Sequence, residues 1–151
     1  MDNVDRKIMN IIQENAKISN IDIARNLGMA PSSILERIRR LERRGYVKSY
    51  EARLDHRKLG LNLTAFIWLD TDERIGVSEV GAKLIDFPEI QVVHDDSGEY
   101  CYVLMVRVAD TDALADLMTR IGQLPLVRKS HTTLVLKTEK ESCRLFIPEE
   151  L

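Results

Sequence analysis

Five arginines fall close together in the segment GMAPSSILERIRRLERRGY, which runs from residue 28 to residue 46: Arg37, Arg39, Arg40, Arg43 and Arg44. A guanidinium group is always charged, and its planar fork of donors suits phosphate oxygens and the O6 and N7 acceptors of guanine. An arginine-rich helix face is, however, often only a solvated surface. The segment predicts a nucleic-acid contact if the surrounding elements hold it outward.

The charge of the chain is divided unevenly between its two halves. The net charge is −2, but residues 1–60 hold 13 Lys and Arg against 8 Asp and Glu. Residues 61–151 hold 9 basic residues against 16 acidic ones. A basic half joined to an acidic half indicates that only the first half meets a polyanion.

Two short helices are expected before the arginine segment. Isoleucines recur at helical spacing over residues 3–14, and Asp2 or Asn3 is available as the N-cap of that helix. Ser19 can cap a second helix, which Gly28 can end in the left-handed conformation.

The arginines themselves belong to a predicted third helix. Pro31 suits its first turn, Gly45 ends it, and Ile34, Ile38 and Leu41 fall on one stripe. The arginines therefore cover the opposite side.

The residues that follow this helix predict a wing. Residues 46–55 alternate apolar and polar side chains, which is typical of a short hairpin, here carrying Lys48 and Arg53. Two helices joined by a tight glycine turn, the second one basic, match a helix-turn-helix, whose second helix enters the DNA major groove. We predict a winged helix-turn-helix over residues 1–53.

After a linker expected at residues 54–62, the pattern changes to strands. Residues rich in β-branched and aromatic side chains predict strands at 63–70, 89–95, 99–108 and 127–137. Helical spacing predicts helices at 77–87 and 110–122, and Gly98 is expected to form a tight hairpin between the second and third strands. The order βαββαβ is ferredoxin-like, so we predict an α+β protein whose second domain covers residues 63–151.

Both faces of the predicted sheet are apolar. In the third strand Tyr102 and Leu104 point one way, and Val103 and Met105 the other. Two helices cover one face only, so the other needs a second cover, and a second copy of the chain is the simplest one. We therefore expect a homodimer.

Other features exclude several classes of protein. No apolar run approaches the ~20 residues of a bilayer span, and two aspartates near the start argue against a signal peptide, so we expect a cytoplasmic protein with no membrane partner. Cys101 and Cys143 lack CxxC spacing. The candidate metal ligands are scattered: His94, Asp95, Asp96 and His131. We expect neither a metal nor a cofactor.

The sequence resembles the Lrp/AsnC family of transcription factors, the leucine-responsive and asparagine-operon regulators. The resemblance covers nearly the whole chain and is carried by DNVDRKIMNIIQENAKIS (2–19), IARNLGMAPSSILERIRRLERRGYVKSYEARLD (23–55), LG (59–60) and DDSGEYCYVLMVRV (95–108). It implies a winged helix-turn-helix that binds double-stranded DNA and a ligand-sensing domain that dimerises and often assembles into octamers. It also implies amino-acid effectors.

The resemblance implies two sets of site residues. Contacts to DNA would come from Ser32, Ser33, Glu36, Arg37, Arg40, Arg43, Arg44 and Lys48, the last three near the backbone. Glu36 is as readily explained by an ion pair with Arg40. The effector would contact Gly98, Glu99, Tyr100, Cys101, Ser130 and Thr132. Ser130 and Thr132 are equally interpretable as ordinary strand residues.

Two positions depart from the family pattern. Ala30 stands where a serine commonly precedes the proline, and losing such a cap costs about 1 kcal/mol. Cys101 stands where the family usually has an aspartate that could pair with an effector ammonium group, which a protonated thiol cannot do. Four explanations of Cys101 stay open. Glu99 supplies the missing negative charge, the effector is of another kind, the pocket is empty in this protein, or Cys101 is a redox-sensing thiol.

Two alternatives remain beside a sequence-specific regulator. Siroheme decarboxylases share this architecture but usually carry a His-Asn-Tyr signature, and the corresponding stretch here, VHDDSGEY, keeps only His94. The chain has no GxSxG elbow and no glycine-rich phosphate loop, so we expect no enzyme. A DNA architectural protein of low specificity is the other alternative.

Overall fold

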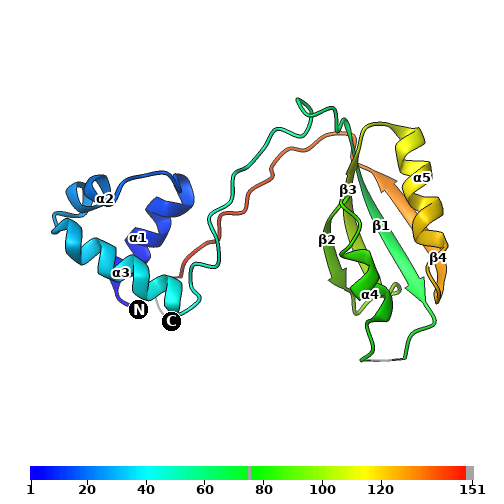
Figure 1. Ribbon diagram of the computed structural model, residues 1–151, viewed down its shortest axis with the longest axis horizontal. Helices are drawn as coiled ribbons and strands as arrows, with labels where there is room; N and C mark the ends of the chain where they lie inside the picture. The colour runs from blue at the N-terminus through cyan, green and yellow to red at the C-terminus, as the bar shows by residue number, and fades with distance from the viewer. Residues whose placement is uncertain (75, 149–151) are drawn as a thin grey trace. The chain divides into compact units, whose positions relative to one another are not determined.

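The computed structural model describes residues 1–74 and 76–148. Its chain forms two compact units (Figure 1). One unit, which we call the head, combines Met1–Arg53 with residues 140–148. The other, the sheet unit, is Leu54–Glu139.

The head contains three helices, α1 (Asn3–Glu14), α2 (Asn20–Leu27) and α3 (Pro31–Arg43). Their ends are fixed by local interactions, as the sequence predicts. Asp2 caps α1 in a reciprocal capping box with Asp5. Ser19 caps α2, which ends at Gly28 in the left-handed conformation with φ 66°.

Apolar side chains from all three helices close the core of the head: Ile8, Met9, Ile23, Ala24, Ile34, Ile38 and Leu41. The contribution of α3 to this core is the predicted stripe. Because these positions occupy one side of the helix, its remaining side chains face outward or toward α1.

The hairpin expected over residues 46–55 is absent: this segment contains no strand. Two strands need a turn between them, and no Gly, Pro or Asn interrupts the alternating pattern. Tyr50 instead donates its hydroxyl proton to Glu42 Oε1 at 2.9 Å. Burial, with the nearby Glu42 carboxylate, raises the pKa of Tyr50 to about 12.

The chain returns to the head after the sheet unit. The Gln13 side chain makes two hydrogen bonds with the backbone of Leu145, accepting from its nitrogen at 2.6 Å and donating to its oxygen at 3.3 Å. Arg144 pairs with Glu14 at 3.0 Å, and Ile147 packs against the head core. We call residues 140–148 the strap.

The sheet unit has the predicted βαββαβ order: β1 (Leu63–Thr71), α4 (Glu79–Leu84), β2 (Ile90–Asp95), β3 (Tyr102–Val108), α5 (Thr111–Gly122) and β4 (Val127–Leu134). The strands are antiparallel and lie in the order β2-β3-β1-β4, which is the ferredoxin-like arrangement. The predicted α+β fold class is confirmed.

Side chains of the sheet alternate between two faces. Ala65, Ile67 and Leu69 are buried in a core with residues of α4 and α5. The opposite positions form what we call the open face: Phe66, Trp68 and Asp70 of β1, Val103 and Met105 of β3, and Lys129, His131 and Thr133 of β4. Within the described residues of this unit, no helix covers the open face.

The connection between β2 and β3 differs from the predicted tight hairpin. Asp95 pairs with Tyr102, so six residues, 96–101, form the loop. Gly98 is not among the glycines with positive φ, because a loop of this length does not require a left-handed residue at its centre. None of the helices in the described part of the chain has the length and apolar character that a membrane span requires.

Candidate nucleic-acid interface

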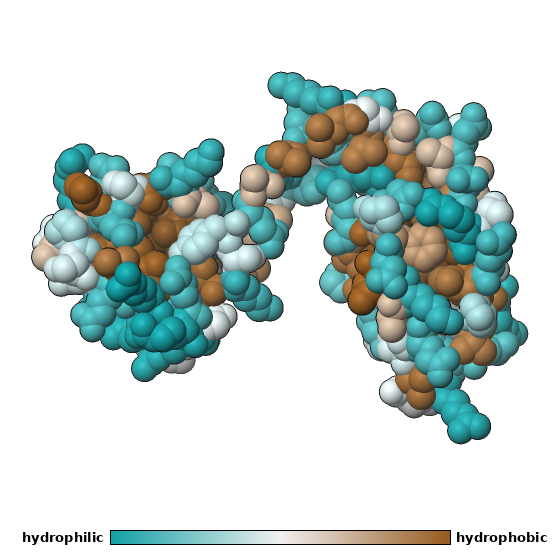
Figure 2. All heavy atoms as spheres, in the orientation of Figure 1, coloured by the Kyte–Doolittle hydropathy of each residue, from teal (hydrophilic) through white to brown (hydrophobic). Residues whose placement is uncertain are grey.

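The outward side of α3 carries an exposed stripe of polar and basic side chains. It consists of Ser32, Glu36, Arg39 and Arg43, which lie opposite the buried stripe and which we call the outer ridge. Arg44 and Lys48 follow the helix and are also exposed. Figure 2 shows hydrophilic side chains gathered on the side of the head where α3 lies.

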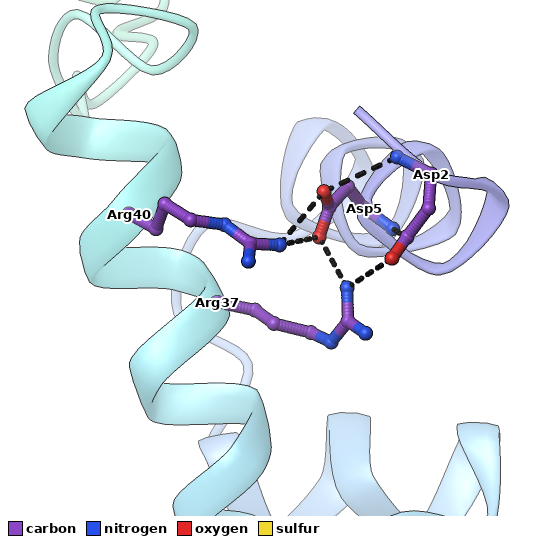
Figure 3. Close-up of polar contacts among 4 residues, drawn as sticks. All are labelled: Asp2, Asp5, Arg37 and Arg40. Carbon is purple, nitrogen blue, oxygen red and sulfur yellow. Dashed lines mark hydrogen bonds and ion pairs between the residues drawn. The ribbon is translucent and has the colours of Figure 1, made fainter.

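Arg37 and Arg40 are arranged differently, because both turn toward the start of α1 (Figure 3). Nη1 of Arg37 lies 2.7 Å from Asp2 Oδ2 and 2.7 Å from Asp5 Oδ1. Nη2 of Arg40 lies 3.0 and 3.1 Å from the two carboxylate oxygens of Asp5. We call these four residues the α1–α3 clamp.

The clamp is built around a buried charge. The side chain of Asp5 is 4% exposed, against 23% for Arg37 and 40% for Arg40. Burial opposes ionisation of Asp5, but its hydrogen bonds with Arg37 and with the Asp2 backbone outweigh it, so its pKa is lowered. The hydrogen bond from Arg37 likewise lowers the pKa of Asp2. Both aspartates are therefore charged at neutral pH, and the clamp fixes α3 against α1.

The structure brings the predicted DNA-contact residues onto α3 and the turn after it, in two groups. Ser32, Glu36, Arg43, Arg44 and Lys48 are exposed, and Ser33 is half-buried. Arg37 and Arg40 belong to the clamp, so Arg40 pairs with Asp5 rather than with Glu36.

Sequence reasoning left Arg39 out of the predicted contacts, although it belongs to the outer ridge. Arg39 lies on the side of the helix opposite Ile34 and Ile38, and this spacing in the sequence could have placed it among the predicted DNA contacts. Ala30, at the N-cap of α3, makes no side-chain capping hydrogen bond, in agreement with the expected loss of a cap.

The predicted effector residues lie in two places. Tyr100 and Cys101 are half-buried in the loop after β2, beside the exposed Gly98 and Glu99. Ser130 and Thr132 pair with residues of the helix-covered face, and the Thr132 hydroxyl lies 3.6 Å from Met118 Sδ of α5. The structure therefore does not bring these two groups together on one face.

Cys101 has a neighbour that sequence reasoning missed. Its Sγ lies 3.9 Å from Asp70 Oδ1 and 3.8 Å from the carbonyl oxygen of Thr71. Strand alternation puts Asp70 on the open face, where it pairs with Lys129 of β4. The alternation along residues 63–70 is the sequence signal that could have placed Asp70 on this face.

The scattered histidines do not come together. His94 lies on β2 and His131 on β4, the two edge strands of the sheet. Among the described residues, no group of three or more His, Cys, Asp or Glu side chains is placed to hold a metal ion.

Comparison with known families divides the sequence in the same way as the fold. Residues 1–48 match the family described as winged helix-turn-helix DNA-binding, and residues 64–145 match the Lrp/AsnC ligand binding domain.

Individual relatives are similar over nearly the whole chain. The HTH-type transcriptional regulator FL11 of Pyrococcus furiosus is 35% identical over 146 residues, which are 96% of this chain and 95% of that protein. The leucine-responsive regulatory protein of Escherichia coli is 34% identical over 152 residues, covering 97% and 92%. A solved transcriptional regulator of Neisseria meningitidis, in complex with L-Met, superimposes with a TM-score of 0.93 at 26% identity, covering 100% of this chain and 99% of that one.

Proposed function

The chain belongs to the Lrp/AsnC family of DNA-binding transcription regulators, and we propose that it binds operator DNA as a homo-oligomer under the control of an amino-acid-like effector. The relatives above are named as regulators of transcription, which agrees with the expectation that the chain is not an enzyme.

The outer ridge is the observation that carries the proposal for DNA. Ile34, Ile38 and Leu41 hold α3 by its apolar side, so Ser32, Glu36 and Arg43 point outward where a major groove can receive them. Arg44 and Lys48 are exposed at the end of α3 and contact phosphates, which adds salt-sensitive affinity without sequence preference.

Arg37 and Arg40 have a double role in this proposal. Their contacts with Asp2 and Asp5 use Nη1 of Arg37 and Nη2 of Arg40. A guanidinium group has five N–H donors, so each arginine keeps others for a phosphate or base edge. The clamp orients both side chains before DNA arrives, which lowers the entropic cost of the contact.

The apolar side chains that the open face leaves without a covering helix among the described residues support the proposed assembly. This face carries Phe66, Trp68, Val103 and Met105, and Phe66 is 36% exposed. Burying such a face against a second copy gives a dimer, and larger rings such as an octamer follow from further contacts. A dimer presents two heads to two half-sites of an operator.

A small-molecule effector would act on this assembly. The match to a ligand-binding domain and the L-Met complex of the Neisseria regulator support an amino acid or a close analogue. An effector that binds one arrangement of dimers better than another shifts the population toward it, and so changes the spacing of the heads. We place this activity in the cytoplasm, where chromosomal DNA is accessible.

The direct test is binding to defined duplexes. DNA selected by the full chain from a random pool is titrated beside a scrambled duplex of the same length and composition at fixed salt. We expect a specificity ratio of about 10³ or more. Equal affinity for both would instead support the architectural alternative, and no binding at low salt would overturn the proposal.

A further inference from the structure

A groove runs along one side of α3 in the head. Its volume is about 290 Å³, close to the lower end of the range for small-molecule sites, ~300–1,000 Å³. Its apolar lining comes from the three helices and from the turn between α1 and α2: Ile12, Ala16, Ile18, Ile23, Leu35 and Ile38. We call this cavity the head groove, and its lining suits the apolar part of a ligand.

The two sides of α3 that flank the outer ridge are held differently, which leaves the head groove open. On one side, the clamp fixes Arg37 and Arg40 to the start of α1. On the other side, Leu35, Arg39 and Glu42 follow one another at spacings of four and three residues, so they share a side of the helix. Arg39 and Glu42 are exposed and Leu35 is half-buried. Apolar surface beside this side of α3 is therefore within reach of a ligand.

Arg39 gives the head groove an unpaired cation. Among the described residues, its guanidinium group makes neither an ion pair nor a hydrogen bond. The carboxylate of Glu42 instead accepts a hydrogen bond from the Tyr50 hydroxyl at 2.9 Å. The planar donor fork of Arg39 matches a ligand carboxylate. A phosphate fits this place less well, because Glu42 repels its larger negative charge more strongly.

The ring of Tyr50 supplies an aromatic wall to the head groove. Its hydroxyl is held by Glu42, and the residue is 49% exposed. Such a ring can pack against the ring of a ligand in an offset or edge-to-face arrangement. The head groove therefore combines an apolar floor, an aromatic wall and one unpaired cation, which together suit a small aromatic acid.

We propose that the head groove binds a small aromatic monocarboxylate. The ligand carboxylate accepts hydrogen bonds from Arg39, and the ligand ring packs on Leu35 and Ile38 beside Tyr50. All the residues that line the groove fall between positions 12 and 50. They lie outside residues 64–145, which match the ligand binding domain, so this is a second site for a small molecule, located in the head itself.

Occupancy of the head groove has a consequence for DNA, which rests on the DNA-binding function proposed above. Arg39 belongs both to the groove and to the outer ridge. A carboxylate that engages its guanidinium group neutralises a cation that faces the duplex. The aromatic acid and DNA therefore weaken each other's binding by the same factor.

The first experiment measures binding of the acid and the need for its charge. The ¹⁵N-labelled full chain is titrated with benzoate, phenylacetate and indole-3-acetate, and amide chemical shifts are followed by NMR. We expect the best of these acids to bind with a Kd below about 1 mM and to shift amides of α3 near Arg39. Its primary amide keeps the ring but lacks the charge, and should bind about tenfold or more weakly.

The second experiment assigns the ligand to the head groove with two variants. Arg39→Gln should weaken binding of the acid about tenfold or more and remove its advantage over the amide. Its matched control is Arg25→Gln, which removes an exposed arginine that pairs with Asp22. Ala16→Phe places a ring in the groove from an exposed position and should abolish binding of both ligands, whereas Ala16→Ser should not.

The third experiment tests the competition with DNA. A saturating concentration of the acid should weaken binding of the selected duplex to wild-type chain about fivefold or more, and should leave Ala16→Phe unaffected. Unchanged DNA affinity of wild-type chain would remove the competition. Chain that binds the acid but no duplex at low salt would overturn the DNA-binding function and leave the site in the groove standing.

Three outcomes would overturn the site itself: no acid that binds below about 10 mM, variants that bind the acid like their controls, or shifted amides confined to the sheet unit. A second copy of the chain is the competing occupant, because Phe146 of the strap is 89% exposed. If the acid bound only after Phe146→Ala, the strap of another copy would fill the groove and the inference would fail.

Discussion

Asp5 is the residue that contributes most to holding α3 against α1. It is buried, caps the start of α1 with Asp2, and accepts hydrogen bonds from Arg37 and Arg40. Removing one partner of a buried ion pair costs about 3–5 kcal/mol, and we expect the lower end for Asp5→Asn because both arginines stay partly exposed. Denaturant unfolding followed by circular dichroism measures this loss. Asp22→Asn, which breaks an exposed pair with Arg25, is the control, and equal stability of the two variants would contradict the role given to Asp5.

The same carboxylates give the head a defined dependence on pH. The pKa values of Asp2 and Asp5 are lowered in the folded chain, so their contribution to the free energy of unfolding is fully present above the unfolded value of about 3.9. It is lost as the pH falls through the folded values. Wild-type chain should therefore lose more stability than Asp5→Asn as the pH is lowered from about 5 to 3. Parallel curves for the two proteins in denaturant titrations at each pH would count against this explanation.

At the scale of elements, the strap extends the head beyond the three helices. Ile147 packs against the head core, whereas the neighbouring Phe146 is 89% exposed. Full burial of such a side chain is worth about 1.5–3 kcal/mol, so we expect Ile147→Ala to lower the free energy of unfolding of the head by about 1–2 kcal/mol. Phe146→Ala should have little effect. Hydrogen exchange of α1 amides distinguishes the two variants, and equal protection would show that the strap does not stabilise the head.

The helices of the head could be predicted almost to the residue because their boundaries depend on neighbours in the sequence. Ser19, Gly28 and Pro31 each act within one turn of the helix they begin or end. The strands of the sheet unit were likewise readable from alternation, although β4 ends at Leu134 rather than at residue 137.

Contacts between distant parts of the chain could not be predicted from local sequence patterns. The strap contacts Gln13 from 132 residues away, and Arg37 meets Asp5 across 32 residues. Arginine spacing predicts which side of α3 is basic, but not which guanidinium groups an internal carboxylate engages. Pairing of Asp70 with Lys129 similarly required the register of β1 and β4.

At the scale of the whole molecule, the uneven charge of the chain has a consequence for DNA. The acidic half repels a duplex, so affinity must come from the head, where Arg43 and Arg44 are exposed and outside the clamp. Each phosphate neutralised by a protein cation releases counterions and contributes about −0.9 to the slope of log K against log salt. The proposed dimer would double the number of such contacts for each duplex.

This slope gives a prediction that separates phosphate contacts from base contacts. Arg44→Ala should weaken binding to selected and scrambled duplexes by the same factor and make the slope shallower by about 0.9 for each head engaged, because a phosphate contact is blind to sequence. Glu36→Gln should change the preference between duplexes and leave the slope nearly unchanged. Fluorescence anisotropy over a series of salt concentrations measures both quantities, with Arg128→Ala in the sheet unit as the matched control. If Arg44→Ala gave the slope of that control, the phosphate contact assigned to the end of α3 would be wrong, and the affinity would have to come from the remaining cations of the head.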